Sequence, residues 1–244
     1  EQGTGIVHCA PSHGPDDFNL CLKHGIKSLD TIDDDGRYTK HIKKFEGIHI
    51  FKADQIVIEN LKECKKLLAS GKLTHSYPHS WRSKAPLVHR ATSQWFISME
   101  KKDLRKKALK AIDDTDFYPE KGRDRIRSMI ETRPDWCISR QRIWGVPLPL
   151  FVSKKTKEPL KDPGVIENIA KIFEKEGADC WFTDDPQKFL GKKYKKEDYI
   201  KSNDIVEVWF DSGATHTYVL EKRKDLIWPA SMYLEGSDQH RGWF

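Results

Sequence analysis

Hydrophobic residues recur at helical spacing in five segments of the chain. In the second of these segments, Val57, Leu61 and Cys64 fall on one side of the predicted helix. Gly71 follows the segment and is a typical helix stop. The pattern predicts helices over residues 15–24, 54–70, 103–112, 122–131 and 165–176.

Short apolar runs bounded by turn residues predict strands between these helices. We expect strands over residues 5–10 (GIVHCA), 205–210 (IVEVWF) and 232–234, and a turn at the acidic run 33–36. Strands and helices alternate after about residue 76. This order favours an α/β layer architecture.

Composition indicates a folded protein rather than a disordered or membrane-spanning one. Charged residues make up 33% of the chain, but both signs are interspersed, and eight Trp and eleven Phe supply bulky core material. No apolar run approaches the roughly 18 residues of a membrane helix. The net charge of +6 permits a polyanionic partner, although solvated lysines give the same balance. Five cysteines without a C-x-x-C pair argue against a disulfide scaffold and a local zinc knuckle, and favour a reducing compartment.

The two ends predict an internal segment of a longer protein. The chain starts at Glu1 with neither an initiator Met nor an apolar leader, and it stops at Phe244 without a helix stop or polar tail.

Polar residues gather first around the predicted helix at residue 15. His8 and His13 flank a loop, and Asp16 and Asp17 follow at the helix start. The carboxylates suit a catalytic or binding role, but they equally suit capping of the helix. A metal site is disfavoured because Pro11 interrupts the spacing between the two histidines.

Two further segments carry candidate chemistry. Arg140 and Arg142 alternate with apolar residues near Trp144, which suits phosphate or base contacts, or a buried strand whose arginines pair with carboxylates. The other segment comprises acids that follow predicted strands, at Asp211 and at Glu235. In open α/β sheets, ligands bind outside such strand ends.

Together these segments resemble the isoleucyl-tRNA synthetases. The run GTGIVHCAPSHGPDDF at 3–18 resembles the editing-domain motif of that family. Three further runs resemble the catalytic-core motifs of the family: WCISRQRIWGVP at 136–147, WFDSG at 209–213 and YLEGSDQHRGWF at 233–244. The matches lie at both ends and in the middle, so the resemblance covers essentially the whole chain.

The resemblance implies a class I synthetase that joins isoleucine to tRNA(Ile) through an aminoacyl-adenylate and hydrolyses mischarged valyl-tRNA. Residues 1–75 would be the C-terminal part of an inserted, β-rich editing domain. Residues 76–244 would be part of a Rossmann-like α/β catalytic core. ATP with Mg²⁺ would be a substrate, and we expect a monomer without membrane attachment, in the bacterial cytoplasm or alternatively in the mitochondrial matrix.

The resemblance also implies roles for individual residues. Asp17 would receive the α-ammonium group of the mischarged amino acid, with His8 beside the same pocket. Glu235 would hold the aminoacyl-adenylate, and Trp209 and Trp243 would wall the side-chain pocket. Three further residues would surround the ribose of the adenylate: Gly236, Asp238 and Gln239.

Departures from the family pattern limit these expectations. Two nucleotide-binding signatures and the threonine-rich editing wall are absent, so we expect this segment alone to be inactive in aminoacylation. Ser80 and Ser83 stand where some relatives carry the cysteines of a zinc site, so no zinc is expected. The alternatives are a valyl- or leucyl-type synthetase, a freestanding editing deacylase, and a non-catalytic RNA-binding module.

Overall fold

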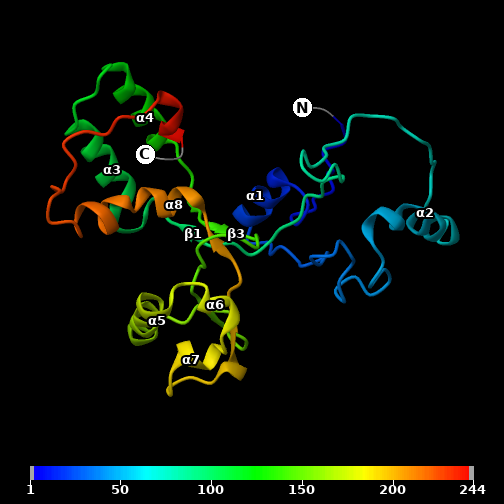
Figure 1. The fold of residues 1–244 in the computed structure, drawn as a ribbon. Coiled ribbons are helices and arrows are strands. Elements are labelled where there is room, and N and C mark those ends of the chain that lie inside the picture. The colour runs from blue at the N-terminus through cyan, green and yellow to red at the C-terminus, as the bar shows by residue number, and fades with distance from the viewer. Residues whose placement is uncertain (1–2, 242–244) are drawn as a thin grey trace. The chain divides into compact units, whose positions relative to one another are not determined.

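A computed structural model describes residues 3–241 of the chain (Figure 1). The chain divides into two compact units, one up to Ser93 and one from Gln94 onward. The change from editing to catalytic domain near residue 76, which the family resemblance implies, stays a prediction. Within the described part, no helix combines the length and the apolar character needed to cross a membrane.

The first unit contains two α-helices and long irregular segments. The helical elements are α1 (Pro15–Lys23), the 3-10 turn η1 (Ile50–Lys52) and α2 (Ala53–Glu63). Pro15 opens α1 with the backbone angle that a first helical residue requires. At the other end, Gly25 has a φ of +69°, and the amide of Ile26 donates to the Cys21 carbonyl over 2.8 Å. The prediction for 15–24 is therefore confirmed to within a residue.

Helix α2 ends seven residues earlier than predicted. Lys65 adopts a left-handed φ of 55°, and the amide of Lys66 donates back to the Leu61 carbonyl over 2.9 Å. This closure satisfies a terminal carbonyl and stops the helix. Leu68, which the sequence places on the helix face, is fully exposed at 101%.

The predicted strand over 5–10 is wrong, whereas the predicted turn at 33–36 is confirmed. Residues 5–10 have no strand partner among the described residues, and Ile6 is 89% exposed. Asp33 organises the turn, because its Oδ1 accepts from the amides of Asp35 at 3.0 Å and Arg37 at 2.9 Å. A strand needs a neighbouring strand to pair its backbone groups, and a short apolar run alone does not supply one.

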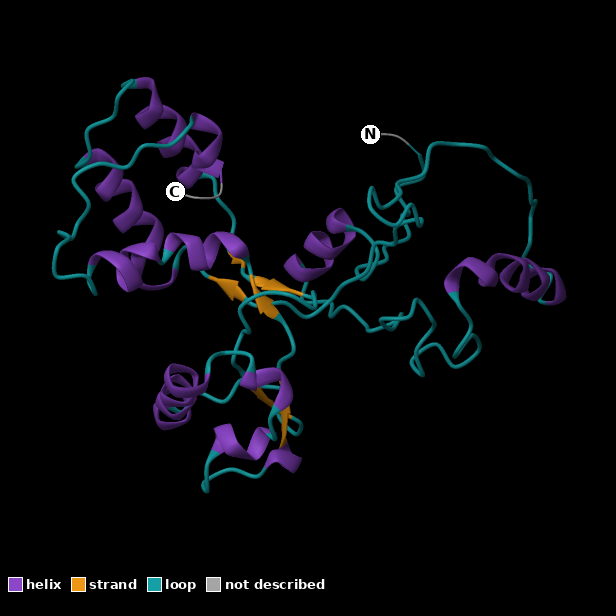
Figure 2. Ribbon diagram, in the orientation of Figure 1, coloured by secondary structure: helices purple, strands orange, loops and turns teal. Residues whose placement is uncertain are grey.

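The second unit mixes short helices with three small sheets (Figure 2). The α-helices are α3 (Leu104–Asp113), α4 (Lys121–Glu131), α5 (Pro163–Glu176), α6 (Cys180–Thr183), α7 (Pro186–Leu190) and α8 (Val208–Gly213). The other helical turns are η2 (Lys101–Asp103), η3 (Lys196–Asp198), the π-type η4 (His216–Leu220) and η5 (Ser237–Arg241). The strands are β1 (Phe96–Ile97), β2 (Trp136–Cys137), β3 (Ser139–Arg140), β4 (Phe151–Ser153), β5 (Tyr199–Lys201) and β6 (Ile205–Val206).

All three sheets are antiparallel pairs: β1 with β2, β3 with β6, and β4 with β5. Mixed helix and strand confirms the α/β class, but a Rossmann-like parallel sheet is not formed by the described residues. Two predicted strands also differ from the structure. The segment 205–210 is a strand only through Val206 and becomes helical at Val208, and 232–234 is irregular, with Leu234 88% exposed.

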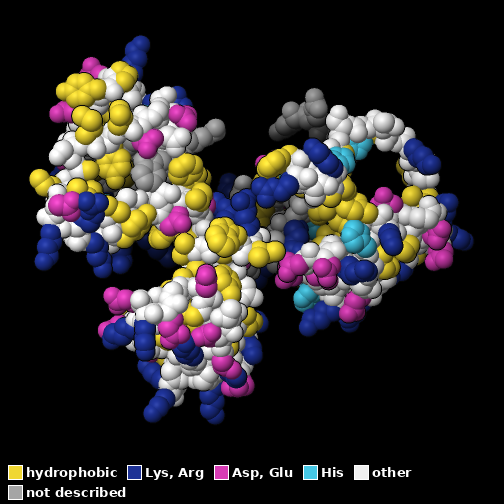
Figure 3. All heavy atoms as spheres, viewed as in Figure 1, with side chains coloured by type: hydrophobic (Ala, Val, Ile, Leu, Met, Phe, Trp, Pro, Cys, Tyr) yellow, Lys and Arg dark blue, Asp and Glu magenta, His cyan; other side chains and the backbone are white. Residues whose placement is uncertain are grey.

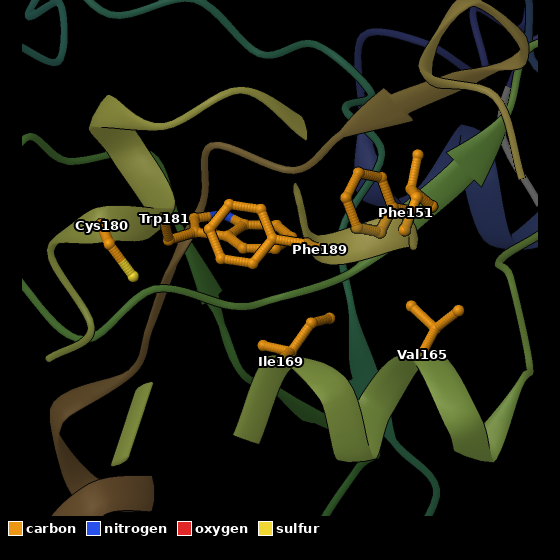
Figure 4. Packing of buried hydrophobic residues seen from close by; sticks show 7 residues of the cluster. Phe151, Val165, Ile169, Cys180, Trp181 and Phe189 are labelled. Carbon is orange, nitrogen blue, oxygen red and sulfur yellow. The ribbon is translucent and has the colours of Figure 1, made fainter. Parts of the chain in front are cut away.

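Two hydrophobic clusters hold the second unit. The larger one packs α5, α6 and α7 against β4 (Figure 4) and consists of Phe151, Val165, Ile169, Cys180, Trp181, Phe189 and Leu190. The smaller one joins α3 to α4 and consists of Ile112, Ile126 and Ile130. The smaller cluster is built from two predicted helices, whereas the larger one combines the predicted helix α5 with α6, α7 and β4, which the hydrophobic pattern does not predict.

Candidate active site

The loop before η5 presents Glu235 to solvent. Glu235 and Gly236 are both exposed, and the Glu235 carboxylate forms no hydrogen bond or ion pair with any other described residue. An ionised carboxylate without an internal partner is free to bind a cationic group such as an ammonium ion. The structure therefore leaves Glu235 available for the role that the sequence assigns to it.

The residues after Glu235 form one tight turn. The amide of Gln239 donates to the Gly236 carbonyl over 2.9 Å, and its side-chain amide donates to Asp238 Oδ2 over 2.9 Å. A Cβ at position 236 would lie 2.6 Å from Asp238 Oδ1, so a larger residue there would require the Asp238 carboxylate to shift. Gly236, Asp238 and Gln239 thus lie in one turn, and their contact with the adenylate ribose stays a prediction.

His240 anchors this turn against α4. Its side chain is buried at 7% exposure, and its ring lies beside Gly122, where an added Cβ would be 3.6 Å from Cε1. Burial, together with the positive charge of Arg125, holds the pKa of His240 below its usual range. The buried His240 side chain thus fixes the end of the turn that carries the candidate site.

Trp209 lies in the first turn of α8, a separate element of the same unit. Its side chain is 37% exposed. Trp243, the other predicted wall of the side-chain pocket, lies outside the described residues.

Glu207 is a site-adjacent residue that the sequence reasoning missed. It is 6% exposed, and its Oε2 accepts from the Trp209 amide over 2.9 Å as the N-cap of α8. The signal was a single carboxylate inside the apolar run IVEVW, where a charged side chain requires a partner.

The two arginines that alternate in the sequence have different surroundings. Arg140 is half-buried, and its Nη1 donates to the carbonyls of Cys137 at 2.9 Å and Ser139 at 2.8 Å. Its Nη2 is 3.9 Å from Glu207 Oε1. Arg142 is exposed and follows the end of β3, so only Arg140 lies on the strand.

In the first unit, Asp17 braces the loop before α1. Its Oδ2 accepts from the Ala10 amide over 2.8 Å, while its other oxygen accepts nothing within the described residues. The N-cap of α1 is Gly14 and no side chain makes a capping bond, so neither Asp16 nor Asp17 caps the helix by a hydrogen bond, although both place negative charge in its first turn. Asp17 is partly exposed, and His8 is exposed upstream of the same loop.

His13 has a structural contact on each ring nitrogen. Its Nδ1 is 3.0 Å from the His89 carbonyl, and its Nε2 is 2.7 Å from Thr31 Oγ1. These bonds connect the loop before α1 to two later segments of the first unit. Among residues 3–241, no three His, Cys, Asp or Glu side chains are grouped as metal ligands, and the expected lack of zinc stays a prediction.

The surface has no dominant charged patch in the view of Figure 3, where Lys and Arg side chains are scattered among Asp and Glu. A hollow of about 420 Å³ beside α3 is lined partly by ion pairs, such as Arg105 with Glu100 at 2.7 Å and Arg127 with Asp113 at 2.5 Å. None of the predicted site residues lines this hollow.

Sequence comparison identifies the family of this chain. The family model described as tRNA synthetases class I (I, L, M and V) matches residues 23–244, and the chain belongs to this family. Curated relatives of the chain include proteins named isoleucine–tRNA ligase. The protein from Pelagibacter ubique is 77% identical over all 244 residues, and the protein from Gluconobacter oxydans is 51% identical over 256 aligned residues. The chain spans about a quarter of the length of these relatives, 27% in both cases. The resemblance to isoleucyl-tRNA synthetases is confirmed.

Proposed function

We propose that the chain forms part of an enzyme that ligates isoleucine to tRNA(Ile). In the first step, the carboxylate of isoleucine attacks the α-phosphate of ATP, and pyrophosphate leaves. In the second step, a ribose hydroxyl of the tRNA attacks the carbonyl of the adenylate, and AMP leaves. Such chemistry depends on positioning and charge stabilisation and needs no protein nucleophile.

The observation that carries this proposal is the identity of 77% with an isoleucine–tRNA ligase over the full chain, combined with the open carboxylate of Glu235. In the proposal, Glu235 binds the isoleucine part of the adenylate. The turn formed by Gly236, Asp238 and Gln239 contacts its ribose, and Trp209 and Trp243 wall the side-chain pocket.

Editing is the second part of the proposal. An apolar pocket discriminates poorly against an amino acid that is one methylene smaller, a limit of which isoleucyl-tRNA synthetases are themselves the standard example. Asp17, with His8 nearby, would bind the ammonium group of a mischarged valyl-tRNA end in a separate pocket within residues 1–75. The support is that Asp17 keeps one carboxylate oxygen available while the other is fixed by Ala10.

The remaining proposals concern the setting of the reaction. Mg²⁺ would enter with ATP and be held through its phosphates, as is common for this ion. The relatives compared above are bacterial, which supports a bacterial cytoplasmic location. We also propose that the enzyme is a monomer, and that residues 1–244 alone do not aminoacylate tRNA, since the relatives are nearly four times longer.

Isoleucine-dependent exchange of pyrophosphate into ATP by the complete gene product tests the function. Glu235→Gln should lower kcat/KM for isoleucine about 100-fold, because truncating one partner of a desolvated charge pair costs about 3 kcal/mol. Glu221→Gln, at an exposed glutamate of the same unit, is the matched control and should behave as the parent. A parent that shows no isoleucine-dependent exchange would refute the function. Near-normal exchange in Glu235→Gln would refute only the role of Glu235.

A further inference from the structure

Glu207 connects two motifs that are about 70 residues apart in the sequence. Its main-chain amide donates to the Ile138 carbonyl over 2.7 Å, which ties it to the segment WCISRQ. Its side-chain Oε2 accepts from the Trp209 amide over 2.9 Å, which ties it to the segment WFDSG. Glu207 therefore connects the end of β6 to the segment between β2 and β3 through its main chain, and it binds the first turn of α8 through its side chain.

Other contacts converge on the same junction. Ser139 pairs with Val206 across β3 and β6, immediately before Glu207. The rings of Trp136 and Phe210 lie 6.0 Å apart between centroids, so the side chain after Trp209 also packs on β2. Arg140 Nη2 lies 3.9 Å from Glu207 Oε1, which places a positive charge beside the second carboxylate oxygen.

The burial of Glu207 makes its hydrogen bond to α8 consequential. Glu207 is 6% exposed and its bond to the Trp209 amide is partly buried, so loss of the carboxylate leaves that amide without its partner where access to water is limited. The first turn of α8 is also short of other constraints, because its leading amides have no intrahelical acceptors. The orientation of Trp209 therefore depends on the cap.

We propose that Glu207 is a positioning residue for the isoleucine side-chain pocket, acting through the capping bond that fixes Trp209 at the start of α8. This inference rests on the proposed function, in which Trp209 walls that pocket. Glu207 itself touches no substrate in this proposal. Its loss should weaken the binding of isoleucine and leave the binding of ATP unchanged.

The test compares KM values for isoleucine and for ATP in pyrophosphate exchange by the complete gene product. Glu207→Met keeps the side-chain volume but removes the capping oxygen, and KM for isoleucine should rise about tenfold while KM for ATP stays within about twofold. Glu207→Gln retains an acceptor oxygen for the Trp209 amide and should restore KM for isoleucine to within about threefold of the parent. Glu221→Met is the matched control at an exposed site.

KM is insensitive to the fraction of enzyme that folds, so a merely structural role would lower kcat and leave both KM values unchanged. That result, or an equal rise in both KM values, would overturn the inference. Equal defects in Glu207→Met and Glu207→Gln would also overturn it, because the charge rather than the cap would then matter. If Glu207→Met does not fold, Glu207→Ala replaces it with the same expected outcome. A parent without isoleucine-dependent exchange would instead refute the proposed function.

Discussion

The ring of Trp181 lies 4.8 Å from the ring of Phe189, measured between centroids, and both side chains have 0% exposure. The Phe151 ring packs edge-on against Trp181, with its centroid at 5.1 Å (Figure 4). The indole nitrogen of Trp181 donates to the Ser202 carbonyl over 2.8 Å, so the ring is fixed by its polar edge as well as by packing.

Trp181→Ala should destabilise the segment 151–202 by about 3–5 kcal/mol, because it leaves a large cavity and an unpaired carbonyl. Hydrogen exchange of peptides from α5 and α7 in the complete gene product measures the loss as reduced protection. Phe182→Ala changes a neighbouring aromatic residue that is 40% exposed, and should cost about 1 kcal/mol or less. Equal effects of the two substitutions would contradict the assignment of Trp181 to the centre of the cluster.

Ser139→Ala should cost about 1–3 kcal/mol although it removes one atom. The Ser139 side chain is 1% exposed, and its Oγ accepts from the Trp95 amide at 2.8 Å and donates to Gln94 Oε1 at 2.7 Å. Chemical denaturation measures the change in the free energy of unfolding, and Ser128→Ala at an exposed serine is the control. A Ser139→Ala protein as stable as the parent would show that these two bonds contribute nothing net.

Asp162→Asn should lower stability near neutral pH, and the deficit should shrink in acid. The hydrogen bond from Lys193, at 2.6 Å, and those from Tyr194 and the Gly164 amide hold the pKa of Asp162 well below its usual range. The group then stabilises the fold above its unfolded pKa, and this contribution is lost as pH falls through the lower folded pKa. Asparagine still caps α5, so the comparison isolates the charge.

Unfolding of both proteins should be followed from about pH 7 to about pH 3. Asp179→Asn replaces an exposed carboxylate that makes no side-chain capping bond, and should follow the parent throughout. A deficit in Asp162→Asn that stays constant with pH would rule out the ionic contribution.

Asp17→Asn should let valyl-tRNA accumulate in the complete gene product while isoleucylation proceeds normally. Asparagine keeps an acceptor for the Ala10 amide but removes the negative charge that would bind an ammonium group. Asp16→Asn alters an adjacent exposed carboxylate of the same helix turn and is the matched control. If valyl-tRNA does not accumulate, the editing role belongs to another residue. If Asp17→Ala accumulates it but Asp17→Asn does not, Asp17 acts by bracing the loop.

The longer helices were predictable because their signals are local, whereas the short helices α6, α7 and α8 were not predicted. The predicted start of α5 falls near Asp162, whose Oδ1 accepts from the Gly164 amide over 2.8 Å, and the predicted end falls at Gly177. Strands were less predictable because each needs a partner that sequence does not specify. Residues 5–10 form a short apolar run but pair with no described residue. The segment 205–210 changes to helix where the Glu207 side chain accepts a hydrogen bond from the Trp209 amide.

The candidate site was predictable where its residues are consecutive. The hydrogen bonds of the turn from Gly236 to Gln239 join residues that are close in the sequence, so the sequence motif is sufficient to predict the turn. Glu207 could not be assigned in the same way. Its role depends on Ile138 and Trp209, and the contact with Ile138 exists only because β3 pairs with β6.

The pairing of β4 with β5 has an evolutionary consequence. Phe151 is opposite Lys201, and the amide of Ser202 donates to the Leu150 carbonyl over 2.9 Å. The two ends of the segment 151–201 therefore lie side by side. A segment that is closed at its base in this way can lengthen, shorten or be exchanged for another without displacing the strands that flank it. Descendants of one ancestral enzyme could therefore acquire different appendages here while the surrounding framework stays the same.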